Sequence, residues 1–221
     1  MAKPAAPRRE RLEAAAADLF HKAGVAATSL ADVAEAAKVP LGGVYYHFRT
    51  KDDLAAAVVE RQRTRLRALV ARHDDVADPL KRLKAFVDVW ADDREIDARY
   101  GCPIGSICFE IARARGAAGR HAAEPFRVML DWCAEQFRAL GAGRAASGHA
   151  LHLVAALQGI SLTAGVLNDP GAIEAEARHL KAWLGGFQSR SRVRGGRDRR
   201  TRGAGRDDEP RHNKKQGSPR P

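Results

Sequence analysis

The stretch at residues 28–51, TSLADVAEAAKVPLGGVYYHFRTK, constrains the fold of this chain more than any other. Apolar side chains recur at helical spacing over residues 30–37, which predicts a short helix. Pro40 then interrupts the pattern, because proline fixes its own φ and biases the preceding residue away from helical backbone. A second short helix is predicted from Leu41 to His47. The stretch is therefore predicted to form two short helices joined by a tight turn.

Two short helices joined in this way are typical of helix-turn-helix DNA readers, whose second helix enters the major groove. The predicted helix-turn-helix runs from Ser29 to Phe48, and the hydroxyl of Thr28 or Ser29 can cap its first helix. Two glycines allow close approach of the backbone to DNA, and polar side chains can donate to phosphate oxygens. The predicted DNA-contacting residues are Thr28, Ser29, Pro40, Leu41, Gly42, Gly43, Tyr45, Tyr46, His47 and Lys51. The alternative is an ordinary αα-hairpin whose aromatic side chains lie in the core.

This part of the chain closely resembles the N-terminal domain of the TetR family of transcriptional repressors. The resemblance covers roughly residues 8–60, where apolar, glycine, aromatic and lysine positions fall at the family's spacing. The matching residues are Arg11, Leu12, Glu13, Ala14, Ala15, Leu19, Phe20, Gly24, Thr28, Ser29, Val33, Ala34, Gly43, Val44, Tyr45, Tyr46, His47, Phe48, Lys51 and Leu54. The resemblance implies a three-helix DNA-binding domain, followed by a helical domain that binds a small effector and forms a dimer.

The composition favours helices in the rest of the chain as well. Residues are 45% hydrophobic but only 6% aromatic, so alanine and leucine must supply much of the packing, and alanine has the highest helix propensity. We therefore predict an all-α fold with about nine helices. The predicted divisions are a flexible arm (1–7), the helix-turn-helix DNA-binding domain (8–50), a C-terminal ligand-binding and dimerisation domain (51–188) and a disordered Arg-rich tail (189–221).

Glycine, proline and aspartate mark the expected helix boundaries. The helices predicted outside the helix-turn-helix cover residues 8–23, 52–73, 79–99, 119–140, 145–167 and 171–187, and a further helix is entered through Gly101 and Pro103.

The segment GCPIG at residues 101–105 resembles the entry to a helix in one TetR branch, the LmrA/YxaF-like repressors. Members of that branch respond to small, often aromatic or drug-like molecules, which implies a small apolar effector here. Helical bundles commonly hold such ligands between their helices, although a completely filled core is the alternative. The predicted effector-contacting residues are Phe86, Trp90, Ile104, Ile107, Phe126, Met129, Trp132 and Leu157.

The helix predicted over residues 145–167 is apolar over much of its circumference. A helix that is apolar on more than one face needs cover on more than one side. The TetR family forms a two-fold dimer from its last two helices, so the resemblance implies a homodimer through residues 145–167 and 171–187. Two DNA-binding domains about one helical turn apart would then match a palindromic operator on double-stranded DNA.

The net charge of +11 is concentrated in the last part of the chain. From Ser189 onward there are twelve Lys and Arg residues against four acidic ones, a net +8, which leaves only +3 for residues 1–188. This segment has almost no apolar side chains with which to fold. It is predicted either to attract DNA non-specifically or to be a solvated extension without a role.

Cysteine and histidine patterns predict no cofactor and no metal site. The three cysteines form no CxxC pair, and Cys102 and Cys108 would lie about 9 Å apart along a helix, on different faces. Cys102 is predicted to lie near a helix N-terminus, which lowers a thiol pKa, so it is a candidate redox or electrophile sensor. His149 and His152 share a helical face, but such pairs are far more often structural.

The resemblance to the TetR family implies an effector-released repressor, and the sequence predicts that it is cytoplasmic. The chain has no run of about 18 apolar residues, so no membrane span is expected, and its start has no apolar stretch long enough for a signal peptide. Three other classes are alternatives: a nucleoid-type protein that binds DNA through the basic tail alone, a small-molecule carrier, and an enzyme. No convergent set of titratable groups favours an enzyme, so none is predicted.

Overall fold

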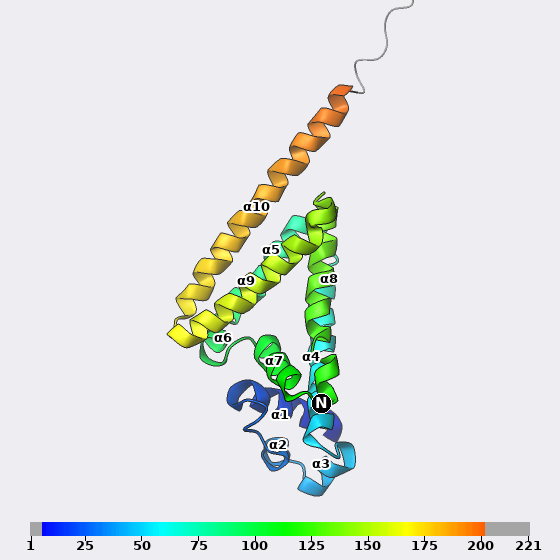
Figure 1. Ribbon diagram of the computed structural model, residues 1–221, viewed down its shortest axis with the longest axis vertical. Coiled ribbons are helices and arrows are strands. Elements are labelled where there is room, and N and C mark those ends of the chain that lie inside the picture. Colours follow the sequence, from blue (N-terminus) through cyan, green and yellow to red (C-terminus); the bar gives the residue numbers. More distant parts are fainter. Residues whose placement is uncertain (1–5, 202–221) are drawn as a thin grey trace, which may run out of the picture.

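Ten α-helices and two short 3-10 helices make up the part of the chain that this computed structural model describes, residues 6–201, with side chains as far as Phe187. The predicted all-α class is confirmed. The sequence predicts about nine helices, and the division of one of them at Asp93 gives ten α-helices. The helices are α1 (Arg8–Ala23), α2 (Leu30–Ala36), α3 (Leu41–His47), α4 (Lys51–Ala71), α5 (Pro79–Asp92), α6 (Arg94–Tyr100), α7 (Pro103–Ala114), η1 (Ala118–His121), α8 (Glu124–Ala139), η2 (Gly143–Ala145), α9 (Ala146–Leu167) and α10 (Pro170–Thr201). Helices α1 to α3 gather at one end of the molecule, and the longer helices extend away from them (Figure 1).

A small core lies under the N-terminal domain, and α7 and η1 also contribute side chains to it. Helices α1, α2 and α3 surround side chains such as Phe20 and Val44, which are almost completely buried. The helices predicted over residues 8–23 and 41–47 match α1 and α3. This core continues into α4 as far as Val59, so it extends beyond the domain boundary expected at residue 50.

Capping boxes fix the residues at which α2 and α4 begin. Ser29 Oγ accepts a hydrogen bond from the Asp32 N–H (3.1 Å), and the Asp32 carboxylate accepts one from the Ser29 N–H (2.7 Å). Thr50 and Asp53 make the same reciprocal pair at the start of α4, at 3.0 and 2.9 Å. Each box satisfies two backbone donors that the helix itself leaves unpaired. The cap of α2 is therefore Ser29 rather than Thr28.

Two of the predicted helices are divided. The helix expected over residues 79–99 is interrupted at Asp93, between α5 and α6. Aspartate is a poor helix former, and carboxylates at a helix C-terminus oppose its dipole, so Asp92 and Asp93 favour this break. The helix expected over residues 119–140 is replaced by η1 and α8. Pro125 lies in the first turn of α8, where proline is tolerated, whereas it would disrupt a helix interior.

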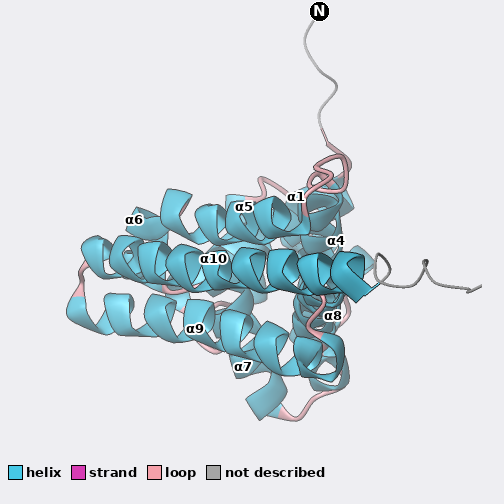
Figure 2. Ribbon diagram, turned by 90° about the horizontal axis from the view of Figure 1, so that it is seen from above, coloured by secondary structure: helices cyan, strands magenta, loops and turns pink. Residues whose placement is uncertain are grey.

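The C-terminal domain encloses a second, larger core between α5, α8, α9 and α10. Figure 2 shows α10 running between α5 and α9. Aromatic rings fill the centre: the Phe86 ring centroid lies 5.1 Å from that of Trp90 and 5.4 Å from that of Trp132. The Phe137 and Phe187 centroids, 5.2 Å apart, join α8 to α10.

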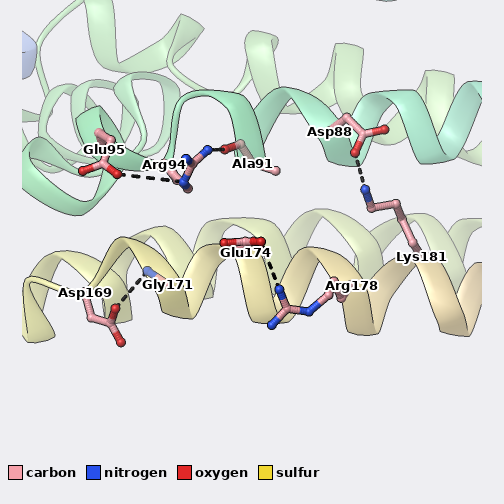
Figure 3. A network of polar contacts seen from close by, with 9 residues as sticks. All are labelled: Asp88, Ala91, Arg94, Glu95, Asp169, Gly171, Glu174, Arg178 and Lys181. Carbon is pink, nitrogen blue, oxygen red and sulfur yellow. Dashed lines mark hydrogen bonds and ion pairs between the residues drawn. The ribbon is translucent and has the colours of Figure 1, made fainter.

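Helix α10 is anchored along the C-terminal domain and is longer than expected. Lys181 of α10 forms an ion pair with Asp88 of α5 (Figure 3). The helix continues to Thr201, past its predicted end at residue 187 and into the segment expected to be disordered. Extending an existing helix costs far less than nucleating one, and arginine is a good helix former. Residues 202–221 of the predicted tail and residues 1–5 of the predicted arm lie outside the described residues.

Helix α9 is unusually apolar. Among the described residues, the segment Gly143–Leu167 is the one helix long and apolar enough to cross a membrane, judged by length and composition alone. This segment contains no uninterrupted apolar run, because small and weakly polar residues lie among its apolar side chains without adding charge. Helix α9 packs against α6, α8 and α10, as a core helix does.

Candidate DNA-binding surface and effector cavity

Helix α3 presents one face to solvent at the far end of the N-terminal domain. The Tyr46 side chain is 85% exposed and that of Tyr45 is 52% exposed, whereas Val44 between them and α1 is fully buried. Leu41 at the start of α3 is also exposed, and Pro40 precedes it as the N-cap residue. The tyrosines therefore do not belong to the core, which excludes the simple αα-hairpin with buried aromatics.

The two glycines of α3 have different reasons for being glycine. A Cβ on Gly43 would lie 2.8 Å from Val39 Cγ1, so a side chain there would collide with the turn between α2 and α3. A Cβ on Gly42 would meet no atom within 4 Å. Gly43 is thus needed for packing inside the helix-turn-helix, and only Gly42 is free to face a DNA backbone. The turn also places Lys38 in the left-handed region, at φ 54°.

Thr28 and Lys51 hold the loop after α1 in place. The Thr28 side chain is only 3% exposed, and its hydroxyl donates to the Gly24 carbonyl at 2.8 Å. Lys51 Nζ donates to the Ala26 carbonyl at 2.9 Å. The sequence predicted both as DNA-contacting residues, but the structure gives them these internal partners. Buried Thr28 in particular cannot reach DNA without local unfolding.

The other predicted contact residues lie near the exposed face of α3. Ser29 is exposed and caps α2, as described above. His47 is half-buried, and its ring centroid lies 5.0 Å from that of Tyr46 in an edge-on arrangement. The structure thus brings together Ser29, Leu41, Tyr45, Tyr46 and His47 with Pro40 and Gly42. Thr28 and Lys51 line the same hollow as Ser29, Leu41 and Tyr45, but both have internal hydrogen-bond partners.

A cavity of about 480 Å³ lies in the C-terminal domain, between α4, α5, α6 and the start of α7. Its size falls within the range of small-molecule sites. It is lined by Gln62, Arg65, Leu66, Leu69, Arg72, His73, Ala85, Val89, Trp90, Asp92, Asp93, Asp97, Cys102, Pro103 and Ile104. The lining mixes apolar walls with several polar groups, which is the usual character of a ligand site.

Of the eight predicted effector residues, only Trp90 and Ile104 line this cavity. Phe86, Phe126, Met129, Trp132 and Leu157 belong to the core of the C-terminal domain or pack against it. Ile107 lies in the core of the N-terminal domain instead. Apolar spacing identifies buried positions, and it cannot separate a filled core from a cavity wall. The polar lining residues were missed because the search used apolar side chains alone.

Asp97 is the one buried carboxylate among the side chains that line the cavity. It is 3% exposed, and Ser161 Oγ of α9 donates a hydrogen bond to its Oδ2 at 2.8 Å. Burial raises the pKa of Asp97 to about 6; the Ser161 hydrogen bond opposes this shift, and the charge of Asp93 adds to it. Two more polar atoms of the lining, Trp90 Nε1 and His73 Nε2, are buried without a hydrogen-bond partner.

Helix α9 carries an exposed apolar stripe on the side away from the core. Val166 is 79% exposed and Leu162 is 70% exposed, and Leu151 and Leu167 are exposed as well. Small residues such as Ala155 separate these side chains. Isolated exposed leucines are ordinary, but a stripe of them along one helix marks a contact surface.

The family model described as "Bacterial regulatory proteins, tetR family" matches residues 12–58, which hold α1 to α3 and the first part of α4. The N-terminal domain is therefore a TetR-type DNA-binding domain. The chain is 25% identical over 183 residues to an HTH-type transcriptional regulator in the lacX 3' region of Lactococcus lactis, covering 78% of this chain and 91% of that relative. It is 33% identical over 93 residues to the regulator TtgR of Pseudomonas putida, covering 41% of this chain and 44% of TtgR.

Solved structures extend the likeness to the whole fold. A TetR regulator from Legionella pneumophila matches with a TM-score of 0.72 at 20% identity, over 82% of this chain and 98% of that one. The family match and the named relatives make this chain a DNA-binding transcriptional regulator of the helix-turn-helix type. Its relatives and its fold are those of regulators, which are not enzymes.

The surroundings of Cys102 argue against the sensor-thiol hypothesis. Cys102 is the N-cap residue of α7, but burial raises its thiol pKa, and the nearby charge of Asp97 raises it further. These effects outweigh the helix N-terminus that was expected to lower the pKa. Burial also raises the pKa values of Cys108 and Cys133 to about 12. All three cysteines are buried and free.

Aromatic packing accounts for the two histidines on α9. The His149 ring centroid lies 4.9 Å from that of Phe187, and the His152 centroid lies 4.9 Å from that of Trp183. Across the described residues, no group of three or more His, Cys, Asp or Glu side chains is arranged to hold a metal ion. These ring contacts explain both histidines as part of the packing between α9 and α10.

Proposed function

We propose that this TetR-family regulator is a cytoplasmic repressor that leaves a palindromic operator when a small molecule fills the cavity of the C-terminal domain. The observation that carries the proposal is the connection of the cavity to the DNA-binding domain through shared helices. Helix α4 contributes Val59 to the N-terminal core and Leu66 to the cavity wall. A ligand that prefers one arrangement of these helices shifts the population toward it and changes operator affinity.

Helix α7 supports a second connection. Its entry, with Cys102 and Ile104, lines the cavity, and its far end reaches the loop after α1. There the Glu110 carboxylate accepts hydrogen bonds from the Val25 N–H at 2.8 Å and the Ala26 N–H at 2.5 Å. A displacement of α7 by a ligand would therefore pull directly on the DNA-binding domain. Glu110 had no place in the sequence analysis, because nothing in its local pattern indicates a contact so distant in the chain.

As a finer proposal, we place this chain close to the LmrA/YxaF-like branch. The branch resemblance lies in residues 101–105, and these residues form the entry to α7. Gly101 has a positive φ of 76°, and Pro103 occupies the first turn of the helix. The motif thus shapes the part of α7 that borders the cavity.

The operator-bound form in this proposal is a homodimer through α9 and α10. The exposed stripe of α9 is apolar and nearly free of charge, and the outward side of α10 carries small side chains such as Ala175 and Ala182. Small residues let helices approach closely, and leucine and valine supply the apolar area. A second copy of the chain related by a two-fold axis would cover both surfaces and form a four-helix contact.

We expect footprinting to reveal the operator. The full chain should protect a palindrome upstream of a neighbouring gene, with half-sites about one helical turn apart. Affinity should fall steeply with salt because Lys and Arg release counterions from phosphates. Protection that has no sequence preference, and that disappears when residues 189–221 are removed, would instead assign DNA binding to the basic tail.

Replacing Tyr46 with alanine should weaken operator binding about tenfold for each DNA-binding domain, since a hydrogen bond to a charged group contributes about 1.5 kcal/mol or more. Because Tyr46 is 85% exposed, thermal stability should stay unchanged. Fluorescence anisotropy with the footprinted operator measures the loss. Tyr46→Phe keeps the ring and removes only the hydroxyl, so it should lose nearly as much. Wild-type affinity in Tyr46→Ala would exclude Tyr46 as a phosphate contact.

Replacing Glu110 with glutamine should loosen the loop after α1. The charged acceptor of two N–H groups becomes a neutral amide, which weakens both hydrogen bonds. We expect the Val25 and Ala26 amides to exchange hydrogen at least several-fold faster, as measured by mass spectrometry. Glu95→Gln, which alters an exposed 3.9 Å ion pair with Arg94, is the matched control and should change nothing. Unchanged exchange at Val25 and Ala26 would remove α7 from the coupling route.

A further inference from the structure

The charges around the cavity are unequally placed. Arg65, Arg72, Asp92 and Asp93 line it, but all four side chains are exposed and lie at its rim. Asp97 is the exception, because it is buried inside. Its carboxylate receives one side-chain hydrogen bond, from Ser161, and none of the ion pairs among the described residues includes it. A buried carboxylate normally has a cationic partner or a full set of donors.

The cavity also holds polar groups that nothing in the protein satisfies. Gln62 is 5% exposed and lines the cavity, and its side chain makes no hydrogen bond among the described residues. Trp90 is 5% exposed, and its indole Nε1 is likewise without a partner. Buried polar groups are rarely left unpaired in native proteins. Two groups without hydrogen-bond partners and a carboxylate without a cationic partner, all on one cavity, indicate the positions at which a bound molecule supplies the partners.

The sign of the ligand charge follows from Asp97. An anionic ligand would be repelled by this carboxylate, and a neutral one would bury it further without compensation. A cation pairs with it inside a cavity, where charges are screened less than in water. Trp90 offers in addition the aromatic side chain on which organic cations bind best.

Resting on the proposed function, we propose that the effector is an organic cation with an aromatic body, whose protonated amine binds the Asp97 carboxylate while its body lies against Trp90. Gln62 then supplies a hydrogen bond to a polar group of the ligand. The rim arginines do not contradict this assignment, because their exposed charges are screened by solvent. Asp97 thus selects the ligand by its positive charge.

Three probes with one skeleton test the charge preference: 2-naphthylmethylamine, 2-naphthalenemethanol and 2-naphthoate. Each is titrated by calorimetry into the full chain at neutral pH, without DNA. We expect the amine to bind about tenfold or more tighter than the alcohol, and the carboxylate to bind most weakly. Equal affinities for the three, or no binding of the amine at concentrations on the order of 1 mM, would overturn the proposal.

Two variants locate the selecting group. Asp97→Asn should reduce amine affinity to that of the alcohol and leave the alcohol unchanged. Asp92→Asn makes the same chemical change at the exposed rim, and it should alter amine affinity less than about threefold. If Asp97→Asn retains the preference, or if Asp92→Asn removes it, Asp97 is not the partner. The three-probe comparison on the parent chain needs neither variant, so a folding defect cannot hide the answer.

The calorimetric result is independent of DNA, and this separates the two proposals. If the amine binds as expected but the operator complex is unaffected, the cation site stands and effector release fails. If the operator is bound and other compounds release it, while the three probes bind alike, repression stands and the cation assignment fails.

Discussion

Replacing Leu162 with glutamate should convert the proposed dimer into monomers and lower operator affinity by at least about a hundredfold. Leu162 is 70% exposed in the single chain and lies at the middle of the apolar stripe on α9. In a two-fold dimer the new carboxylate would be buried together with its symmetry mate, without a partner, at a cost of several kcal/mol. Loss of the dimer would also remove the simultaneous contact of two half-sites, which is worth a large factor in affinity.

Light scattering after gel filtration measures the mass of the Leu162→Glu variant, and anisotropy measures its operator affinity. Phe109→Glu is the matched control, because Phe109 is similarly exposed but belongs to α7. The control should remain dimeric. The stability of the single chain should change little, since Leu162 buries little surface within it. A Leu162→Glu protein that is still dimeric would show that the contact lies elsewhere.

Replacing Asp97 with asparagine should stabilise the ligand-free protein at neutral pH. Burial raises the pKa of Asp97 from 3.8 to about 6, so the ionised carboxylate is less favourable in the folded chain than in the unfolded one. The full difference corresponds to about 3 kcal/mol above pH 6. Because the side chain borders a cavity, solvent relieves part of this cost, and we expect about 1–2 kcal/mol. Asparagine keeps an oxygen to accept the Ser161 hydrogen bond.

The sign of the pH dependence is fixed by the raised pKa. Above about pH 6 the Asp97 carboxylate of the parent chain is ionised, so the variant exceeds the parent in free energy of unfolding by the full amount. As the pH falls from 6 toward 4, Asp97 of the parent is protonated in the folded chain before it is protonated in the unfolded chain. The stability difference between variant and parent should therefore disappear. Thermal unfolding should show a melting temperature about 3–6 °C higher for the variant at pH 7.5 and the same value near pH 4. A variant that is less stable than the parent at pH 7.5 would show that the buried Asp97 carboxylate does not destabilise the folded chain.

Together, the two Asp97 experiments address why such a residue is retained. A side chain that lowers stability in the empty protein and raises ligand affinity is the expected trade between stability and function. The Asp92→Asn control applies here as well, because an exposed carboxylate should leave the melting temperature nearly unchanged.

The sequence was most informative where local chemistry alone sets the structure. The boundaries of α3 follow from Pro40 and from the change of pattern after His47, and Asp78 with Pro79 marks the start of α5. Proline geometry and capping act over a few residues, so they are visible in the sequence. The same local reasoning predicted the exposed face of α3.

Contacts between distant residues could not be predicted in this way. Thr28 and Lys51 have the right types for DNA contacts, but their partners Gly24 and Ala26 were invisible until the loop after α1 was placed. For Cys102, the helix start was predicted and the burial was not, and burial decides the thiol pKa. The cavity could not be predicted for the same reason. Its walls come from four helices, and hydrophobic periodicity does not show how helices pack against one another.

Helix α4 runs through both cores without a glycine or a proline among its 21 residues. At 1.5 Å per residue it is about 30 Å long, and nothing in its sequence allows it to bend sharply. Pivoting such a rod by about 10° at its cavity end would carry the opposite end about 5 Å sideways. In the proposed dimer, two such helices related by the two-fold axis would change the distance between their DNA-binding ends by up to about 10 Å, and a tilt of this size is enough to move both α3 helices out of the major grooves.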